Sequence, residues 1–242
     1  MKRAYLVEMT IFASYVRQLL LLGFLVSLFV CCGMQSIIAA PAILTCMCFM
    51  TGAMGAAGYD EQNDWGLFRL TMPLSRHDVV LARYGVIVTL GLVGLVAGLV
   101  GAGLVTALAT FVDLPMGLSE MLAYRFENVL ATLFSSFFCI FMGSFVASVV
   151  TPLYFRFGQS KATQYLPLIM VLVFFVLPVS LIGNSGLLDG GIVGTDALTS
   201  LLAFIETPAG VAASMGVLLV ASALVLAVSA AISLRLYERR EL

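Results

Sequence analysis

Charge is the scarcest property of this 242-residue sequence, since only 10% of its residues are Asp, Glu, Lys or Arg. Globular domains that fold in water contain about 25% of these residues. Apolar residues make up 62% of the chain, and its mean hydropathy is +1.10. Water cannot be the main solvent of such a chain. The composition therefore predicts an all-α fold, a polytopic helical membrane protein that crosses the bilayer several times.

The residues that most enzymes use for chemistry are also scarce. The two lysines are Lys2 and Lys161, and neither ends a glycine-rich Gly-Lys-Ser/Thr loop, which excludes ATP hydrolysis by a P-loop. The single histidine, His77, has no second histidine with which to hold a metal ion. We therefore expect no catalytic centre in this chain, and no metal or cofactor bound to it.

Long uncharged runs set the expected number of membrane spans. No charged residue occurs from Leu19 to Tyr59, and one helix of that length would measure roughly 60 Å, about twice the hydrocarbon core of a bilayer. We expect this run to fold back near residues 33–41, where Gly33, Gln35, Ser36 and Pro41 favour a turn. Six transmembrane helices follow from this interpretation, at residues 17–35, 39–58, 84–108, 129–150, 165–182 and 211–234.

The basic residues predict the orientation of these spans. With six spans, eleven of the twelve lysines and arginines fall on one side and only Arg125 falls on the other. Lysine and arginine accumulate on the cytoplasmic side of membrane proteins. We therefore expect cytoplasmic N and C termini, external loops at residues 109–128 and 183–210, and a location in the cytoplasmic (inner) membrane of a bacterium. No continuous basic stripe is present, so nucleic acid is not an expected partner.

Residues 1–18 are expected to form an element of their own, followed by a six-span domain at residues 19–242. On a helical projection Tyr5, Met9, Phe12 and Val16 share one stripe, and the opposite side carries Arg3, Thr10, Ser14 and Arg17. This pattern predicts an amphipathic helix that lies along the cytoplasmic interface. The alternative is that the first span simply begins early.

Apart from Arg17 at the very start of the first, the predicted spans contain no Asp, Glu, Lys, Arg or His, which ion-coupled carriers usually need at membrane depth. They do contain the spacing Gly94-xxx-Gly98, which lets a second helix approach closely. That second helix could belong to the same chain or to a second copy, and the sequence leaves both open.

The most polar stretch lies between the second and third predicted spans, at residues 59–83. Asn63 or Asp64 can cap a short helix that displays Trp65 and Phe68, and Pro73 ends it. Ser75 can then cap a second helix that continues into the third span. Exposed aromatic rings predict a docking surface for a soluble partner. The alternative is an interfacial loop whose aromatic rings lie among lipid headgroups.

The same stretch resembles a known loop. The run Leu70-Thr-Met-Pro-Leu-Ser-Arg76, followed by Val79-Val80-Leu81-Ala82-Arg83-Tyr84, is similar to the loop of permease subunits of the type-two class of ABC exporters. The usual motif in that family is close to Leu-Pro-Val-Ser-Arg, so Met72 replaces its common leucine and Leu74 replaces its common valine. The six spans, the cytoplasmic termini and the N-terminal interfacial helix also agree with that family.

The resemblance implies a half-transporter that pairs with a second permease copy or a related chain and docks on two ABC ATPase subunits, which bind the ATP. It also implies that the polar loop couples permease to ATPase, and the expected coupling residues are Glu61, Asp64, Trp65, Phe68, Leu70, Pro73, Ser75 and Arg76. In the external loop, residues 197–205 could form a short helix that acts as an exit gate, as in members of that family. The alternative is a plain flexible loop, which the glycines at 183–194 favour for its first half.

The absence of charge within the spans favours a hydrophobic or amphipathic cargo such as a peptide, a lipid or a drug. A different class of function remains open. The chain could be a membrane-embedded assembly or sensing subunit that anchors a soluble partner without transporting any solute.

Overall fold

The computed structural model describes residues 2–34, 36–62, 75–111, 122, 126–158 and 207–238. These residues form five long helices: α1 (Lys2–Met34), α2 (Ala39–Gln62), α4 (Arg76–Phe111), α6 (Phe126–Phe157) and α11 (Pro208–Glu238). No strand occurs in this part of the chain, so the predicted all-α class is confirmed.

Three of the described helices are long and apolar enough to cross a membrane, namely Arg76–Phe111, Asn128–Phe157 and Pro208–Glu238. A helix of thirty residues measures about 45 Å, which exceeds the hydrocarbon core of about 30 Å. The bent first helix adds a fourth if Arg3–Thr10 and Tyr15–Cys31 are counted as one span, and α2 contains the shorter apolar helix Ala39–Gly55. The chain is therefore a multi-pass membrane protein.

The uncharged run at residues 19–59 folds back on itself, as predicted. Helix α1 ends at Met34 and α2 begins at Ala39, and the turn is closed by hydrogen bonds from Ser36 N to the Cys31 carbonyl (3.2 Å) and from Ala40 N to the Ile37 carbonyl (3.2 Å). Helix α1 itself bends by 57° between Thr10 and Tyr15. Its N-terminal part therefore runs in a different direction from the part that crosses the bundle.

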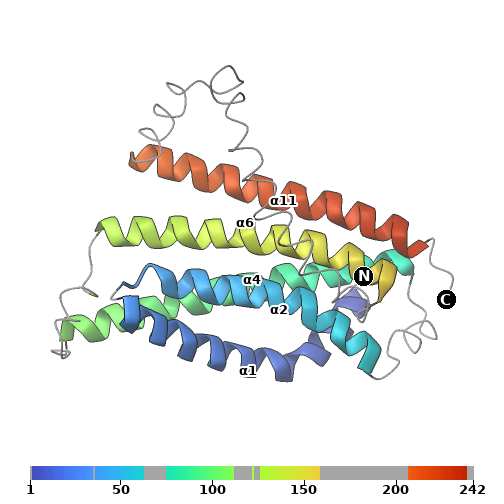
Figure 1. The fold of residues 1–242 in the computed structure, drawn as a ribbon, viewed down its shortest axis with the longest axis horizontal. Coiled ribbons are helices and arrows are strands. Elements are labelled where there is room, and N and C mark those ends of the chain that lie inside the picture. Colours follow the sequence, from blue (N-terminus) through green and yellow to red (C-terminus); the bar gives the residue numbers. More distant parts are fainter. Residues whose placement is uncertain are drawn as a thin grey trace, which may run out of the picture.

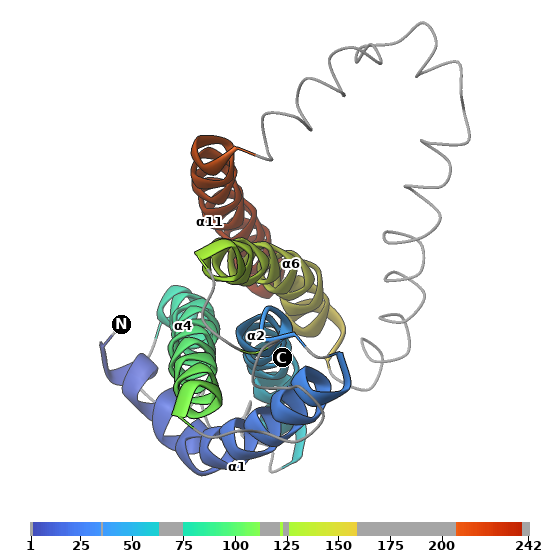
Figure 2. The same ribbon diagram turned by 90° about the vertical axis from the view of Figure 1, so that its left-hand side faces the viewer.

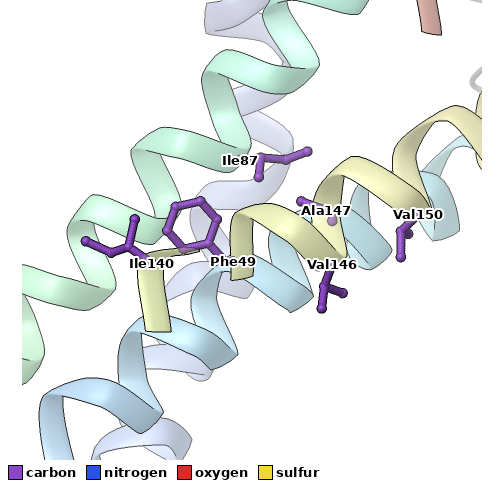
Figure 3. Close-up of a cluster of buried hydrophobic side chains, with 7 residues drawn as sticks. Phe49, Ile87, Ile140, Val146, Ala147 and Val150 are labelled. Carbon is purple, nitrogen blue, oxygen red and sulfur yellow. The ribbon is translucent and has the colours of Figure 1, made fainter. Parts of the chain in front are cut away.

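Helix α2 lies at the centre of the bundle and packs against α1, α4 and α6, while α11 packs on α6 and α4 (Figures 1 and 2). The main apolar core forms where the central helices meet. Phe49 of α2 and Ile87 of α4 lie there beside α6 residues, among them Ile140 and Ala147 (Figure 3). The core is thus a three-helix junction rather than a contact between one helix pair.

Helix α4 approaches α2 closely because glycines face the contact. A Cβ atom added at Gly98 would lie 2.5 Å from the Pro41 Cα atom, and one added at Gly94 would lie 2.9 Å from the Leu44 carbonyl oxygen. No real side chain fits at these distances without a shift of the α2 backbone. In this chain both glycines therefore serve packing between α4 and α2.

Helices α1, α2, α4 and α6 alternate in direction, and α11 runs parallel to α6, so one end of the bundle gathers the start of α1, the ends of α2, α6 and α11, and the start of α4 (Figure 1). We call it the charged end, because the described arginines lie toward it: Arg3, Arg17, Arg76, Arg83, Arg156 and Arg235. The opposite end, which we call the uncharged end, carries no lysine or arginine among the described residues.

Helix α6 ends at the charged end, where Gly158 has a φ of 76° and its N–H bonds the Tyr154 carbonyl (3.0 Å). That left-handed conformation favours glycine and is a common way to end a helix. Helix α11 begins at the uncharged end (Figure 1). The predicted span at 165–182 belongs to the connection between these two points, and it lies outside the described residues together with the predicted gate helix at 197–205.

Candidate functional site at the charged end of the bundle

The first turn of α4 begins directly after the polar loop and is capped by Ser75. The Ser75 hydroxyl oxygen accepts a hydrogen bond from Asp78 N (3.1 Å), and the Ser75 carbonyl accepts one from Val79 N (3.2 Å). A serine in this position satisfies a backbone N–H that has no partner within its own helix. The predicted helix start is thereby confirmed, and the end of the loop is fixed to a long rigid helix.

Arg76 ties this first turn to the last turn of α11. Its guanidinium donates hydrogen bonds to the carbonyl oxygens of Tyr237 (3.2 Å) and Glu238 (2.9 Å), and it lies over the Tyr237 ring at 5.7 Å. The last carbonyls of a helix lack partners and carry partial negative charge, so a cation there is stabilising. Arg76 therefore acts as a clamp between two helices far apart in the sequence.

A buried polar contact holds α4 and α11 together two turns further into the bundle. The Tyr84 hydroxyl lies 2.6 Å from the Ser229 hydroxyl and 2.8 Å from that of Ser233, and Ser229 in turn donates to the Ser148 carbonyl of α6 (2.6 Å). All three hydroxyl-bearing residues are buried. In a membrane such bonds are retained because no water is available to replace them.

The remaining space between these helices is filled by an aromatic pair. The rings of Phe155 from α6 and Tyr237 from α11 lie 5.2 Å apart, and Val80 of α4 belongs to the same cluster. Aromatic pairs at this separation add about 0.5–1.5 kcal/mol beyond the area they bury. The start of α4 and the ends of α6 and α11 thus form one packed junction at the charged end.

Another face of α4 binds the N-terminal part of α1. Arg83 Nη2 lies 3.3 Å from Glu8 Oε1, and their side chains are only 4% and 7% exposed. One turn away, the Tyr5 and Thr89 hydroxyls are 2.9 Å apart. Removing two charges from water costs several kcal/mol per ion, so such a pair persists only with close mutual contact. The ion pair fixes the position of the α1 segment against α4.

The predicted coupling residues are only partly visible. Ser75 and Arg76 lie together at the charged end, against the end of α11. Glu61 belongs to the last turn of α2, where the backbone alone is described, and the other predicted residues lie outside the described part of the chain: Asp64, Trp65, Phe68, Leu70 and Pro73. Gly94 and Gly98 lie deeper in the bundle, against α2.

Sequence reasoning missed Glu8, Arg83, Tyr84 and Tyr237 as parts of this site. Glu8 carried a usable signal, because it lies three residues after Tyr5 and four before Phe12, on the apolar stripe of the N-terminal helix. A carboxylate on a buried stripe indicates a cationic partner elsewhere in the chain. Nothing local marked Tyr237 as the receiver of Arg76, which lies 161 residues away.

The described side chains at this junction are clamps, hydroxyl pairs and aromatic rings. Across the described helices no group of three or more His, Cys, Asp or Glu residues could hold a metal ion. Cys46, Cys48 and Cys139 are free thiols, and Cys48 is buried. The junction is a mechanical connection, because it joins the end of the polar loop, through α4, to α1, α6 and α11.

A bundle of membrane-length helices, joined by polar clamps at one charged end and carrying a polar segment there between α2 and α4, defines a multi-span membrane protein. The comparison with protein families agrees, because residues 6–238 match the ABC-2 family transporter protein model. The chain belongs to this family of transporter membrane components, which associate with an ABC ATPase. No curated protein and no solved structure matched the chain.

Proposed function

We propose that this chain is the permease subunit of an ATP-driven exporter in the cytoplasmic membrane of a bacterium. In this proposal it has six spans and both termini in the cytoplasm, and it pairs with a second copy or a related permease. Separate ATPase subunits bind and hydrolyse ATP at the charged end. The observation that carries the proposal is the anchoring of the polar loop, through Arg76, to the end of α11.

The geometry favours transmission of movement through α4. ATP binding can shift a membrane equilibrium only through contacts that differ between its two states. A displacement of residues 63–74 acts directly on Ser75 and Arg76, and Arg76 is bonded to the α11 backbone. Seven residues further along α4, Arg83 carries the same displacement to Glu8 of α1. A single displacement of the loop would thus reorient α1 and α11 together.

The proposed cargo is hydrophobic or amphipathic, such as a peptide, a lipid or a drug. The described helices keep their arginines toward one end, and the outward faces of α4 and α11 are lined by exposed apolar residues such as Val96 and Val220. A pathway between such faces offers no cage for a small ion. The test is the ATPase rate of the purified complex. If hydrophobic peptides and lipids leave this rate unchanged and a hydrophilic ion raises it, this part of the proposal is contradicted.

The docking role of the loop can be tested with the variant W65A/F68A. Truncation of an aromatic anchor at an interface typically costs 2 kcal/mol or more, about a thirtyfold loss of affinity. We expect the variant to insert normally but to co-purify much less ATPase. Phe111→Ala is the matched control, because Phe111 is 87% exposed at the uncharged end.

Unchanged co-purification of W65A/F68A would assign the two rings to the lipid headgroups instead. A complex that forms with the ATPase but shows no ATP-dependent movement of any tested cargo in liposomes would favour an anchoring or sensing subunit.

A further inference from the structure

Helices α4 and α6 extend beyond α2 at the uncharged end. Gly98 of α4 lies against Pro41, and Ser135 of α6 donates a hydrogen bond to the Ile38 carbonyl (3.0 Å), so both contacts mark the level where α2 begins. Past this level α4 continues to Phe111 and α6 reaches back to Phe126. Thirteen residues of α helix measure about 20 Å. The nine residues of α6 before Ser135, back to Phe126, measure about 14 Å, and over that shorter length α2 no longer separates the two helices.

A pocket of about 400 Å³ occupies this space. Ile37 from the turn between α1 and α2 forms part of its floor, and its walls come from Leu99, Ala102 and Thr106 of α4 and from Val129 and Leu133 of α6. Voids left by ordinary side-chain packing rarely exceed the size of one water molecule. This volume instead lies within the range of ligand pockets, about 300–1,000 Å³.

The lining suits an apolar occupant. The hydroxyls of Thr106, Thr110 and Thr132 each donate to a carbonyl of their own helix, at 2.6, 2.7 and 2.5 Å. Their hydrogens are therefore committed to the protein backbone. Among the described lining residues none is charged, and the one side-chain amide is that of Asn128, near the start of α6. The walls favour hydrocarbon, with room for a polar group only toward the uncharged end.

The pocket opens sideways through the surface of α4. Its lining residues Gly103, Ala107 and Thr110 are exposed. They alternate with Leu104 and Leu108, which are 57% and 58% exposed and project outward. In a bilayer this apolar surface faces hydrocarbon, and an apolar cavity that is open to hydrocarbon gains dispersion contacts when hydrocarbon enters it. We propose that the pocket binds an acyl chain of a membrane lipid from the leaflet at the uncharged end.

Gly103 provides the means to close the pocket. A Cβ atom at Gly103 would meet no other atom within 4 Å, whereas one at Gly101, two residues before it, would lie 2.7 Å from the Phe24 ring. A large side chain at position 103 therefore enters the pocket without disturbing the contacts between helices. Gly216 on α11 is equally open but does not line the pocket, so it offers a matched control.

The test uses the full-length protein in liposomes that contain a phospholipid with a diazirine in the middle of one acyl chain. After photolysis, mass spectrometry locates the labelled peptides. We expect stronger labelling at residues 99–110 and 128–133 than on the exposed face of α11 around Val217 and Leu224. Gly103→Phe should reduce the labelling of the pocket several-fold, and Gly216→Phe should leave it unchanged.

Equal labelling of the pocket and of the α11 face would mean only general lipid contact and would overturn the proposal. Absence of pocket labelling in the wild type would overturn it as well, and would indicate that protein closes the space. Ala107→Phe provides a second obstruction of the same pocket, and thermal unfolding confirms that each variant is folded. The experiment needs neither ATPase nor transport, so its outcome is independent of the proposed function.

Discussion

Glu8 and Arg83 show how a single residue can decide the position of a helix. Both side chains are more than nine-tenths buried and they form an ion pair at 3.3 Å. Their neighbours Phe12, Val86 and Leu90 form an apolar cluster between α1 and α4. Each charge is tolerated there because the other is present, so the pair specifies one relative position of the two helices.

A double-mutant cycle measures this dependence. Loss of one partner from a buried ion pair typically destabilises a protein by about 3–5 kcal/mol, whereas replacement of both by apolar residues is often neutral or stabilising. We expect Glu8→Met and Arg83→Met each to lower the melting temperature in detergent and the double variant to recover much of the loss. Arg17→Met is the control, since Arg17 is exposed on the same helix. Additive effects of the two substitutions would show that the charges act separately.

At this scale the sequence predicts contacts that are local. The Ser75 cap and the apolar stripe of Tyr5, Met9, Phe12 and Val16 follow from spacing within a few turns, and in the structure the stripe packs against α4 rather than facing only the membrane interface. The clamp from Arg76 to the end of α11 depends on which helices become neighbours after folding. Residue spacing holds no information about that, so a single sequence could not reveal it.

At the scale of elements, the contact between α2 and α4 depends on glycines that differ sharply in their surroundings. Gly98 lies against the Pro41 backbone, whereas Gly103, on the same helix, has no atom within 4 Å of an added Cβ. Replacing glycine by alanine inside a helix favours the helix by about 1 kcal/mol at either site. Any difference between the two variants therefore reports packing alone.

We expect Gly98→Ala to lower the melting temperature in detergent and Gly103→Ala to leave it unchanged or raise it. Overpacking of a filled interface typically costs about 1–3 kcal/mol, which outweighs the gain in helix propensity. A raised melting temperature for both variants would show that α2 moves away from α4 at little cost, and a lowered one for both would show that position 103 is not open. The sequence indicated that a helix packs closely at Gly94 and Gly98, but identifying α2 as that helix required the structure.

The helices also exceed the predicted spans. Helix α4 begins at Arg76, whereas the predicted span began at residue 84, and α6 continues to Phe157. Hydropathy locates the part of a helix that lies in hydrocarbon, but hydrogen bonding continues into the interface until a cap or a breaker ends it. Ser75 and Gly158 supply those ends here. The junction at the charged end is built from these extra turns.

At the scale of the whole molecule, the distribution of basic residues is the property that relates the fold to a membrane. All described arginines lie toward one end of the bundle. Helix α6 ends at that end and α11 begins at the other (Figure 1), so residues 159–206 must connect opposite ends. The span predicted at 165–182 would make this crossing and bring the number of spans to six. It stays a prediction.

Orientation can be tested by labelling single cysteines in a variant whose five native cysteines are replaced by alanine. We expect a membrane-impermeant maleimide to label cysteines at the exposed positions His77, Arg156 and Glu238 only from the cytoplasmic side, and those at Gly33 and Thr207 only from outside. The positive-inside rule gives this direction because arginine-rich loops resist translocation. Labelling of His77 from outside would place the polar loop away from any cytoplasmic ATPase. Labelling of Glu238 and Thr207 from one side would contradict α11 as a membrane-crossing helix.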